Sequence, residues 1–420
     1  MKLYRLLTAL TKTSRFTLAL VVILLIAFAA SSNAQTSKTR RGTGKPRAAT
    51  PAPQQDAAFD NAVKLAEEAR AAGRLDEALA SYGKAVQIRP RWPDGWWYLG
   101  AIFYEKDLYT QARDAFRNLA ALQQDRGPVW GMLGLCEFQM KNYEPAVIAL
   151  QRGRALGFDG NQELESVVRY HTALLYIHFE KFEIAFEILK EFLRTGTNYS
   201  PRIPQAFGLV ILRMPLLPNE VPVDKRDEIA LAGDAGINMA ARRLDDARKA
   251  FATLVERYPN DPNAHYSHGV FQLTQDSDLG LKELQRTLEL DPTNQPAMVQ
   301  IAFEYLKREQ FNDGLPWAER AVQLSPKMYP ARNVLGRILL ELGQFDRAVK
   351  ELEEGTRLAP QSPEMHFALA RAYTRAGRKK DADRERETFK QLHEKLRQET
   401  DAAKSNLPPG VTIPNKPDPE

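Results

Sequence analysis

The chain has 420 residues, of which 44% are hydrophobic and 26% charged, and its formal net charge is +5. This composition excludes a disordered protein, and the length suffices to bury a substantial core. Nine Lys and Arg residues and no acidic residue precede residue 54, which leaves 49 basic against 53 acidic residues in the remainder. The part that can fold therefore lacks the overall positive field of a nucleic-acid-binding protein, and we expect no nucleic-acid partner.

Residues 1–34 have the three-part form of a secretory signal peptide. A basic start is followed by an apolar run over 16–30, and Ser32 and Ala34 offer small residues for cleavage before Gln35. The run has 15 residues, short of the roughly 20 that a membrane-spanning helix needs. We predict a periplasmic or secreted protein that meets the membrane only through this leader. The alternative is an uncleaved leader that anchors the protein, facing outward.

Residues 35–55 are rich in Thr, Pro and basic residues and contain almost no large apolar side chain. Such a segment cannot bury enough surface to fold, so we expect a disordered basic linker. The chain has a single cysteine, Cys136, and so no internal disulfide. An exported protein of this kind must be stabilised by packing alone.

Over most of residues 56–396 the sequence repeats itself, and the commonest spacing is 34 residues. Small residues recur inside apolar helical patterns, and short polar turns separate these patterns. The recurring residues include Trp96, Leu99 and Gly100, matched by Trp130, Leu133 and Gly134, and the prolines Pro292, Pro326 and Pro360. Each unit is predicted to be two antiparallel helices in close contact, because the small residues allow the helices to approach. No stretch alternates as a strand does, which predicts an all-α fold.

The repeats are predicted to form two arrays. The first covers 56–194 and the second 224–400, and the second ends in a charged capping helix. Between them, 195–223 contains five prolines and is too apolar for a free linker, so we expect an ordered Pro-rich insert. Residues 401–420 are expected to form a disordered Pro-rich tail.

This pattern resembles the tetratricopeptide repeat family. The stretch WYLGAIF at 97–103, preceded by Trp96 and followed by Ala112 and Phe116, follows that family's order of Trp, Leu-Gly, aromatic, Ala and Phe. Similar units begin near residues 59, 93, 127, 166, 228, 262, 295, 329 and 363. The resemblance implies a right-handed α-solenoid of stacked helix-turn-helix repeats. It also implies that Trp96 and Trp130 pack inside their units, whereas Trp97 faces the inner groove.

By the same resemblance, the groove that binds partner peptides is lined by one residue set in each array. The N-terminal set is apolar and aromatic: Trp97, Tyr104, Leu135 and Phe138. The C-terminal set is rich in cations: Phe303, Lys307, Asn333, Arg337, Phe367, Arg371 and Arg375. The family's Lys/Asn clamp for a terminal carboxylate is incomplete here. We still expect the C-terminal groove to prefer acidic segments, because arginine can engage carboxylates with two parallel hydrogen bonds.

Motifs for catalysis are missing from the sequence. His265 and His268 share one helix face, as some metal ligands do, but no HExxH pattern or nearby cysteine accompanies them. No phosphate-binding glycine loop or Gly-x-Ser-x-Gly motif occurs either. We therefore predict a non-enzymatic interaction scaffold of the cell envelope, without metal or cofactor, that binds other proteins or peptide segments. The alternatives are an anchored structural or assembly factor and a helical metal-dependent enzyme.

Overall fold

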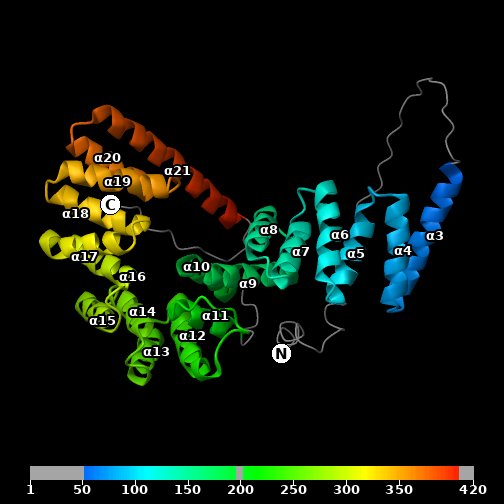
Figure 1. Cartoon of the computed structure of the whole chain (residues 1–420), viewed down its shortest axis with the longest axis horizontal. Coiled ribbons are helices and arrows are strands. Elements are labelled where there is room, and N and C mark those ends of the chain that lie inside the picture. Colours follow the sequence, from blue (N-terminus) through cyan, green and yellow to red (C-terminus); the bar gives the residue numbers. More distant parts are fainter. Residues whose placement is uncertain (1–51, 195–201, 406–420) are drawn as a thin grey trace. The chain divides into compact units, whose positions relative to one another are not determined.

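A computed structural model describes residues 52–194 and 202–405 (Figure 1). This part of the chain forms nineteen α-helices and one short 3-10 helix, and it contains no strand. The predicted signal peptide and most of the predicted linker and tail lie outside the described residues. The helices up to the insert are α3 (Ala52–Ala71), α4 (Leu75–Ile88), α5 (Pro93–Glu105), α6 (Tyr109–Leu122), α7 (Gly127–Gln139), α8 (Tyr143–Leu156), α9 (Gln162–His178) and α10 (Phe182–Arg194).

The remaining helices continue the same alternation of helix and short turn. They are α11 (Arg202–Ile211), η1 (Val223–Lys225), α12 (Arg226–Ala240), α13 (Leu244–Arg257), α14 (Pro262–Gln272), α15 (Ser277–Leu290), α16 (Gln295–Lys307), α17 (Phe311–Leu324), α18 (Tyr329–Glu341), α19 (Phe345–Leu358), α20 (Pro363–Arg375) and α21 (Lys379–Ser405). In six repeats the first helix begins at the residue predicted from the sequence. These helices are α5, α7, α14, α16, α18 and α20.

The chain divides into two compact units, the N-terminal unit (1–251) and the C-terminal unit (252–420), with the division inside α13. Within each unit, consecutive helices pack as antiparallel hairpins, such as α7 with α8 and α18 with α19. The first helices of neighbouring hairpins also contact each other, as α16, α18 and α20 do. The predicted all-α fold of stacked helix-turn-helix repeats is confirmed.

Glycine at the centre of a first helix permits the close packing within a hairpin. A Cβ atom at Gly134 would lie only 2.6 Å from Cδ2 of Leu150 and 2.9 Å from the backbone nitrogen of that residue. Gly100 faces the ring of Phe116 in the same way, at 2.8 Å. A larger residue at either position would push α7 from α8, or α5 from α6.

In most hairpins the turn contains one residue with positive φ at the same place in the repeat, whereas the turn between α14 and α15 has none. Glycine occupies this turn position in some repeats, for example Gly343 (φ 75°) and Gly377 (φ 77°). In others a residue with a side chain does so, including Lys141 (φ 62°) and Glu309 (φ 57°). This conformation crowds a Cβ atom against the following carbonyl, so the non-glycine turns carry some strain.

Several predicted boundaries differ from the observed ones. The described part of the insert is ordered, and its helix α11 packs against α12 within the N-terminal unit. The two compact units therefore do not divide at 223/224, the limit of the predicted second array. This arises because α11 buries Phe207, Leu209 and Ile211 and so belongs to the core.

The ends of the helical region also extend beyond their predicted limits. Helix α3 begins at Ala52, inside the predicted linker, and α21 continues to Ser405, inside the predicted tail. Helix α21 packs on α20 and buries Ala382, whereas many of residues 383–398 are exposed and charged. It thus has the polar outer surface expected of a capping helix.

Candidate functional site

One position of the first helix carries an N–H donor in five repeats. Trp96 and Trp130 donate their indole N–H to the carbonyl oxygens of Pro90 and Gln124, at 2.8 and 2.9 Å. Both tryptophans are partly buried, and both pack against the buried residues of the N-terminal core. Each ring covers the junction with the preceding helix. Its N–H donates to a backbone carbonyl six residues earlier, near the end of that helix, where carbonyl groups lack a partner within the helix.

His265, Arg332 and His366 occupy the same position in later repeats. Nε2 of His265 and of His366 lies 3.1 and 3.0 Å from the carbonyl oxygens of Pro259 and Pro360, and Nε of Arg332 donates to Pro326 at 2.8 Å. Each of the three side chains also pairs with a carboxylate of the following helix: Glu283, Glu351 and Glu385. These contacts give the two histidines a structural role within their hairpins.

The surroundings of His265 show what this pairing does electrostatically. Its Nδ1 lies 2.6 Å from Oε2 of Glu283, and this hydrogen bond raises the pKa of His265 although burial acts in the opposite direction. Burial would raise the pKa of Glu283, but the hydrogen bonds from His265 and His268 outweigh it and hold that pKa at about 2. Because both ring nitrogens of His265 contact oxygen atoms of the protein, the pair resembles a buried ion pair more than a metal site. Among residues 52–194 and 202–405, no cluster of three or more His, Cys, Asp or Glu could hold a metal ion.

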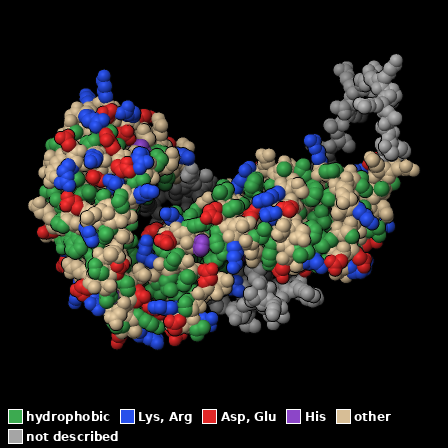
Figure 2. Space-filling model, in the orientation of Figure 1, with side chains coloured by type: hydrophobic (Ala, Val, Ile, Leu, Met, Phe, Trp, Pro, Cys, Tyr) green, Lys and Arg blue, Asp and Glu red, His purple; other side chains and the backbone are tan. Residues whose placement is uncertain are grey.

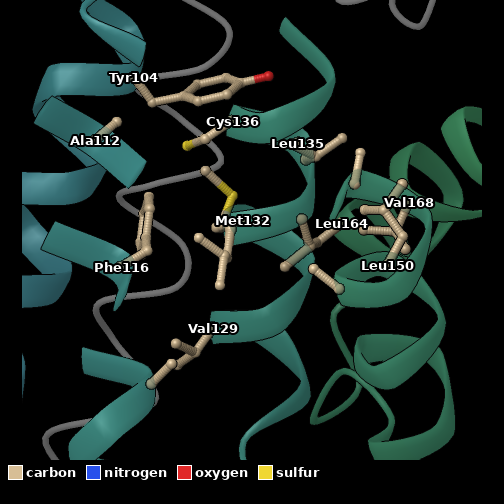
Figure 3. Packing of buried hydrophobic residues seen from close by; sticks show 14 of the residues in the cluster. Tyr104, Ala112, Phe116, Val129, Met132, Leu135, Cys136, Leu150, Leu164 and Val168 are labelled. Atoms are coloured by element: carbon tan, nitrogen blue, oxygen red, sulfur yellow. The ribbon is translucent and has the colours of Figure 1, made fainter. Parts of the chain in front are cut away.

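The residues predicted to line the N-terminal groove are mostly internal. Tyr104 is 6% exposed and Leu135 is 2% exposed, and both lie in the core cluster that Figure 3 shows around Cys136 and Leu150. Trp97 is partly buried, with its ring edge-on to Phe116 at 5.6 Å between centroids. These contacts make Tyr104 and Leu135 core residues of the structure, which differs from the expected open apolar strip.

Phe138, the fourth residue of that set, is also packed. Its ring lies 5.8 Å from Tyr143 and 4.8 Å from the imidazole of His171. His171 is itself buried, and burial lowers its pKa to about 4, so the imidazole is neutral at physiological pH. The aromatic residues of α7, α8 and α9 thus pack against one another inside the N-terminal unit.

Four of the predicted C-terminal groove residues lie along α16 and α18. Lys307 is exposed and its Nζ pairs with Oε2 of Glu304 at 2.7 Å. Nδ2 of Asn333 lies 3.2 Å from the sulfur of Met365, on α20. The guanidinium of Arg337 lies over the ring of Phe303, 5.6 Å from its centroid. This part of the surface therefore presents two cations, of which Lys307 is ion-paired and Arg337 lies over an aromatic ring.

The other three predicted residues, on α20, come together at a surface hollow of about 200 Å³ in the C-terminal unit. Phe367, Arg371 and Arg375 follow one another at intervals of four residues and so lie on one face of α20. Phe367 is 41% exposed, an unusual degree for a large aromatic side chain. We call this site the arginine hollow and define it by Glu341, Phe367, Arg371, Thr374, Arg375 and Arg386.

The arginine hollow contains more cations than carboxylates that could neutralise them. Arg371 pairs with Glu341, with 2.9 Å between Nη2 and Oε1, and Arg386 pairs with Asp383 at 2.7 Å. Arg375 lies over the ring of Phe345, 5.4 Å from its centroid. Among the described residues, no carboxylate forms an ion pair with Arg375 or with the neighbouring Arg337. Two positive charges therefore remain without a paired anion in this region.

Arg337 and Arg371 are close enough to repel each other. Burial is the main cause that lowers the pKa of Arg337, and the charge of Arg371 lowers it further, against the opposite effect of Glu341. A bound anion would relieve this repulsion, because it would offer opposite charge to both guanidinium groups. The electrostatics of the arginine hollow thus suit a carboxylate-bearing ligand.

Helix α21 supplies a wall of the arginine hollow that the sequence analysis did not include. Arg386 reaches across to α20, where its Nη2 donates to Oγ1 of Thr374 at 2.7 Å. Phe389 packs against Phe367, with 5.4 Å between ring centroids. The signal in the sequence is the spacing of Ala382, Arg386, Phe389 and His393, which puts one mixed apolar and basic stripe on a helix otherwise treated as a polar cap.

On the face drawn in Figure 2, neither basic nor acidic side chains dominate a large area, and both are interspersed with apolar side chains. Within residues 52–194 and 202–405, no helix combines the length and apolar character needed to cross a membrane.

Comparisons with known proteins agree with the repeats seen in the fold. Three family models match: "Tetratricopeptide repeat" over residues 305–366 and 238–295, and "TPR repeat" over 67–107. A curated relative, the general transcriptional corepressor trfA of Dictyostelium discoideum, is 26% identical over 137 residues. The BBSome complex member BBS4 of Bos taurus is 22% identical over 284 residues. These alignments cover 33% and 58% of this chain, and the chain spans 10% and 49% of the length of these relatives.

Solved structures of MamA are also similar. One, a double mutant named MamA RS-1 ArsTM, is 18% identical with a TM-score of 0.37, covering 41% of this chain and 97% of that one. Another MamA structure is 17% identical with a TM-score of 0.36, covering 44% and 98% of the two chains. The helical hairpins, their 34-residue spacing and the three matching models together show that this is a tetratricopeptide repeat protein.

Proposed function

We propose that the protein is a non-enzymatic scaffold of the cell envelope that binds partner proteins on the surface formed by the first helices of its repeats. Repeats of this family support a role in protein interaction. One relative is named as a member of a complex, which agrees with such a role. The observation that carries the proposal is the arginine hollow, where an exposed aromatic side chain lies among cations that exceed their paired carboxylates.

Exposed aromatic and arginine side chains gathered in a hollow are typical of the centre of a protein interface. Phe367 would lose most of its remaining contact with water under a partner, and the arginines around it would find hydrogen-bond acceptors. The N-terminal unit offers a partner less exposed side-chain surface, because its predicted groove residues already pack in or against its own core. The C-terminal unit is therefore the proposed docking surface.

The experiment is site-specific photo-crosslinking in the native host, with a benzophenone amino acid at position 367 of the full-length chain. A matched probe at Lys350 serves as the control, since Lys350 is exposed on α19 and does not line the arginine hollow. We expect the probe at 367 to capture the same protein repeatedly, and excess unlabelled parent protein to compete for it. Equal capture by both probes, or none at 367, contradicts the proposal.

We also propose that the protein is exported and that its leader is removed before Gln35, because residues 1–34 have the form of a cleavable signal peptide. The N-terminal residue of protein recovered from the envelope distinguishes this from the anchored alternative. A chain that begins at Gln35 supports export and release from the leader. A chain that retains residues 16–30 and stays with the membrane fraction supports an anchored assembly factor instead.

A further inference from the structure

We infer that the arginine hollow binds an internal acidic segment of a partner protein that carries an aromatic side chain next to its carboxylates, and that α21 forms part of this site. The inference rests on the proposed function, because it names the ligand class of the same surface. It gives α21 a role beyond closing the repeat stack.

The cations around the arginine hollow come from three helices. Arg337 is on α18, Arg371 and Arg375 are on α20, and Arg386 is on α21. Among the residues that the structure describes, only Arg371 and Arg386 of these four form ion pairs with carboxylates, and their side chains are 45% and 48% exposed. Exposed ion pairs of this kind contribute little to stability, so a ligand carboxylate can replace Glu341 or Asp383 at small cost.

The aromatic part of the site lies beside the cations. The rings of Phe367 and Phe389 are tilted by 49° and their centroids are 5.4 Å apart, and His393 follows at 5.5 Å from Phe389. This row joins α20 to α21 and leaves Phe367 41% exposed. An aromatic side chain of a ligand could extend the row, and offset or edge-on packing between rings adds to the burial of apolar surface.

The arrangement favours an internal segment over a free chain end. A clamp for one terminal carboxylate brings its donors to a single point, whereas these four arginines are spread over α18, α20 and α21. Several side-chain carboxylates along a segment can each find a guanidinium, and arginine can bind a carboxylate through two parallel hydrogen bonds. The excess of positive charge also selects against a basic segment.

The test uses the full-length protein and a fluorescent peptide with blocked ends, in which four Asp or Glu residues flank one Phe. Two companion peptides replace either the acidic residues by Asn and Gln or the Phe by Ala. Binding is measured by fluorescence polarisation at low and at high salt. We expect the acidic Phe peptide to bind about tenfold more tightly than either companion, and its affinity to fall with salt.

Variants separate the role of α21 from general effects of charge. Arg386→Glu should weaken binding by about tenfold or more, whereas Arg384→Glu should change it by less than about twofold. Both residues lie on α21 and pair with an aspartate, but Arg384 does not line the arginine hollow. Glu341→Gln should tighten binding, because it frees Arg371 for the ligand. Far-ultraviolet circular dichroism checks that each variant keeps the helical content of the parent.

Three results would overturn the inference. They are failure of the acidic Phe peptide to bind, equal binding of the peptide without acidic residues, and an equal effect of Arg384→Glu and Arg386→Glu. If the inference fails while the probe at position 367 still captures a partner, the scaffold role stands and only the ligand class is wrong. If neither experiment succeeds, the proposed docking surface fails as well.

Discussion

Nδ1 of His265 lies 2.6 Å from Oε2 of Glu283, so one ion pair joins α14 to α15. His366 and Glu385 repeat this relationship between α20 and α21, also at 2.6 Å. The two glutamates follow their histidines by 18 and 19 residues, because α15 begins 15 residues after the start of α14, whereas α21 begins 16 residues after the start of α20. The same place in the repeat thus joins the two helices of a hairpin by charge in the C-terminal unit, whereas in the N-terminal unit it holds an indole that donates to the segment before its hairpin.

The first prediction concerns the pH dependence of this pairing. A histidine whose pKa is raised by folding stabilises the protein fully below its unfolded pKa of about 6.5, and the contribution is lost as the pH rises through the folded value. Glu283, with its pKa lowered to about 2, contributes above its ordinary value near 4.5 and loses its effect as the pH falls. The pair therefore stabilises most between about pH 4.5 and 6.5.

His265→Gln should lower the free energy of unfolding by about 1.5–3 kcal/mol at pH 5.5 and by clearly less at pH 8.5. Urea denaturation followed by circular dichroism at the two pH values measures this difference. His393→Gln is the control, because His393 is exposed on α21. A loss of stability that is the same at both pH values would show that the charge of His265 plays no part.

The second prediction concerns the contact between the helices of one hairpin. Gly134→Leu and Ala112→Leu should each cost about 1–3 kcal/mol or more, because Gly134 faces Leu150 directly and Ala112 is completely buried. Since neighbouring repeats share interfaces, the loss should appear first as local unfolding around α5 to α8, detected by hydrogen exchange.

Gly83 provides the matched control for these substitutions. It lies within α4, and a Cβ atom there would meet no other atom within 4 Å. Gly83→Ala should therefore raise stability by about 0.5–1 kcal/mol, as expected for alanine in a helix interior. If Gly134→Leu melted like the parent, the packing described for α7 and α8 would be incorrect.

The third prediction uses the positive-φ position of the turns. Lys141→Gly should stabilise the N-terminal unit by about 0.5–1 kcal/mol, because glycine adopts φ 62° without the clash of a Cβ atom. Gly343→Ala, at φ 75° in the corresponding turn of a later repeat, should destabilise by a similar amount. Thermal melts of the two variants should shift in opposite directions, and a shift of equal sign would contradict the common role of the two positions.

Much of the fold could be predicted from the sequence because the repeat fixes which residues face each other. The 34-residue spacing of Gly100 and Gly134 specifies where two helices must approach, and the start of α7 follows from it at Gly127. The packing of α11 could not be predicted in this way, since the insert has no counterpart in other repeats. Its role depends on tertiary contacts of Phe207 and Ile211 that no local pattern reveals.

The candidate site was predictable only in part, for a related reason. The family's repeat identifies Phe367, Arg371 and Arg375 on α20, but α21 stands at the end of the array and follows no repeat pattern after Ala382. The exposure of a groove residue also depends on its neighbours. Tyr104 is covered because Tyr109 packs on its ring at 5.3 Å, a contact that periodicity does not specify.

The last prediction separates the two predicted grooves by their effect on partner binding. Arg337→Glu combined with Arg371→Glu should remove the protein captured at position 367, because it converts two cations of the C-terminal unit into anions that repel an acidic segment. Trp97→Ala should leave that capture intact and instead destabilise the N-terminal unit by up to about 3 kcal/mol, since Trp97 packs edge-on against the buried Phe116.

The control with the same change of charge is Arg320→Glu combined with Lys350→Glu, two exposed positions on α17 and α19 outside the arginine hollow. Pull-down of the crosslinked partner, with helical content measured for each variant, tests all three proteins together. Loss of the partner in folded Trp97→Ala protein, or its retention by the Arg337 and Arg371 double variant, would place the docking surface elsewhere on the chain.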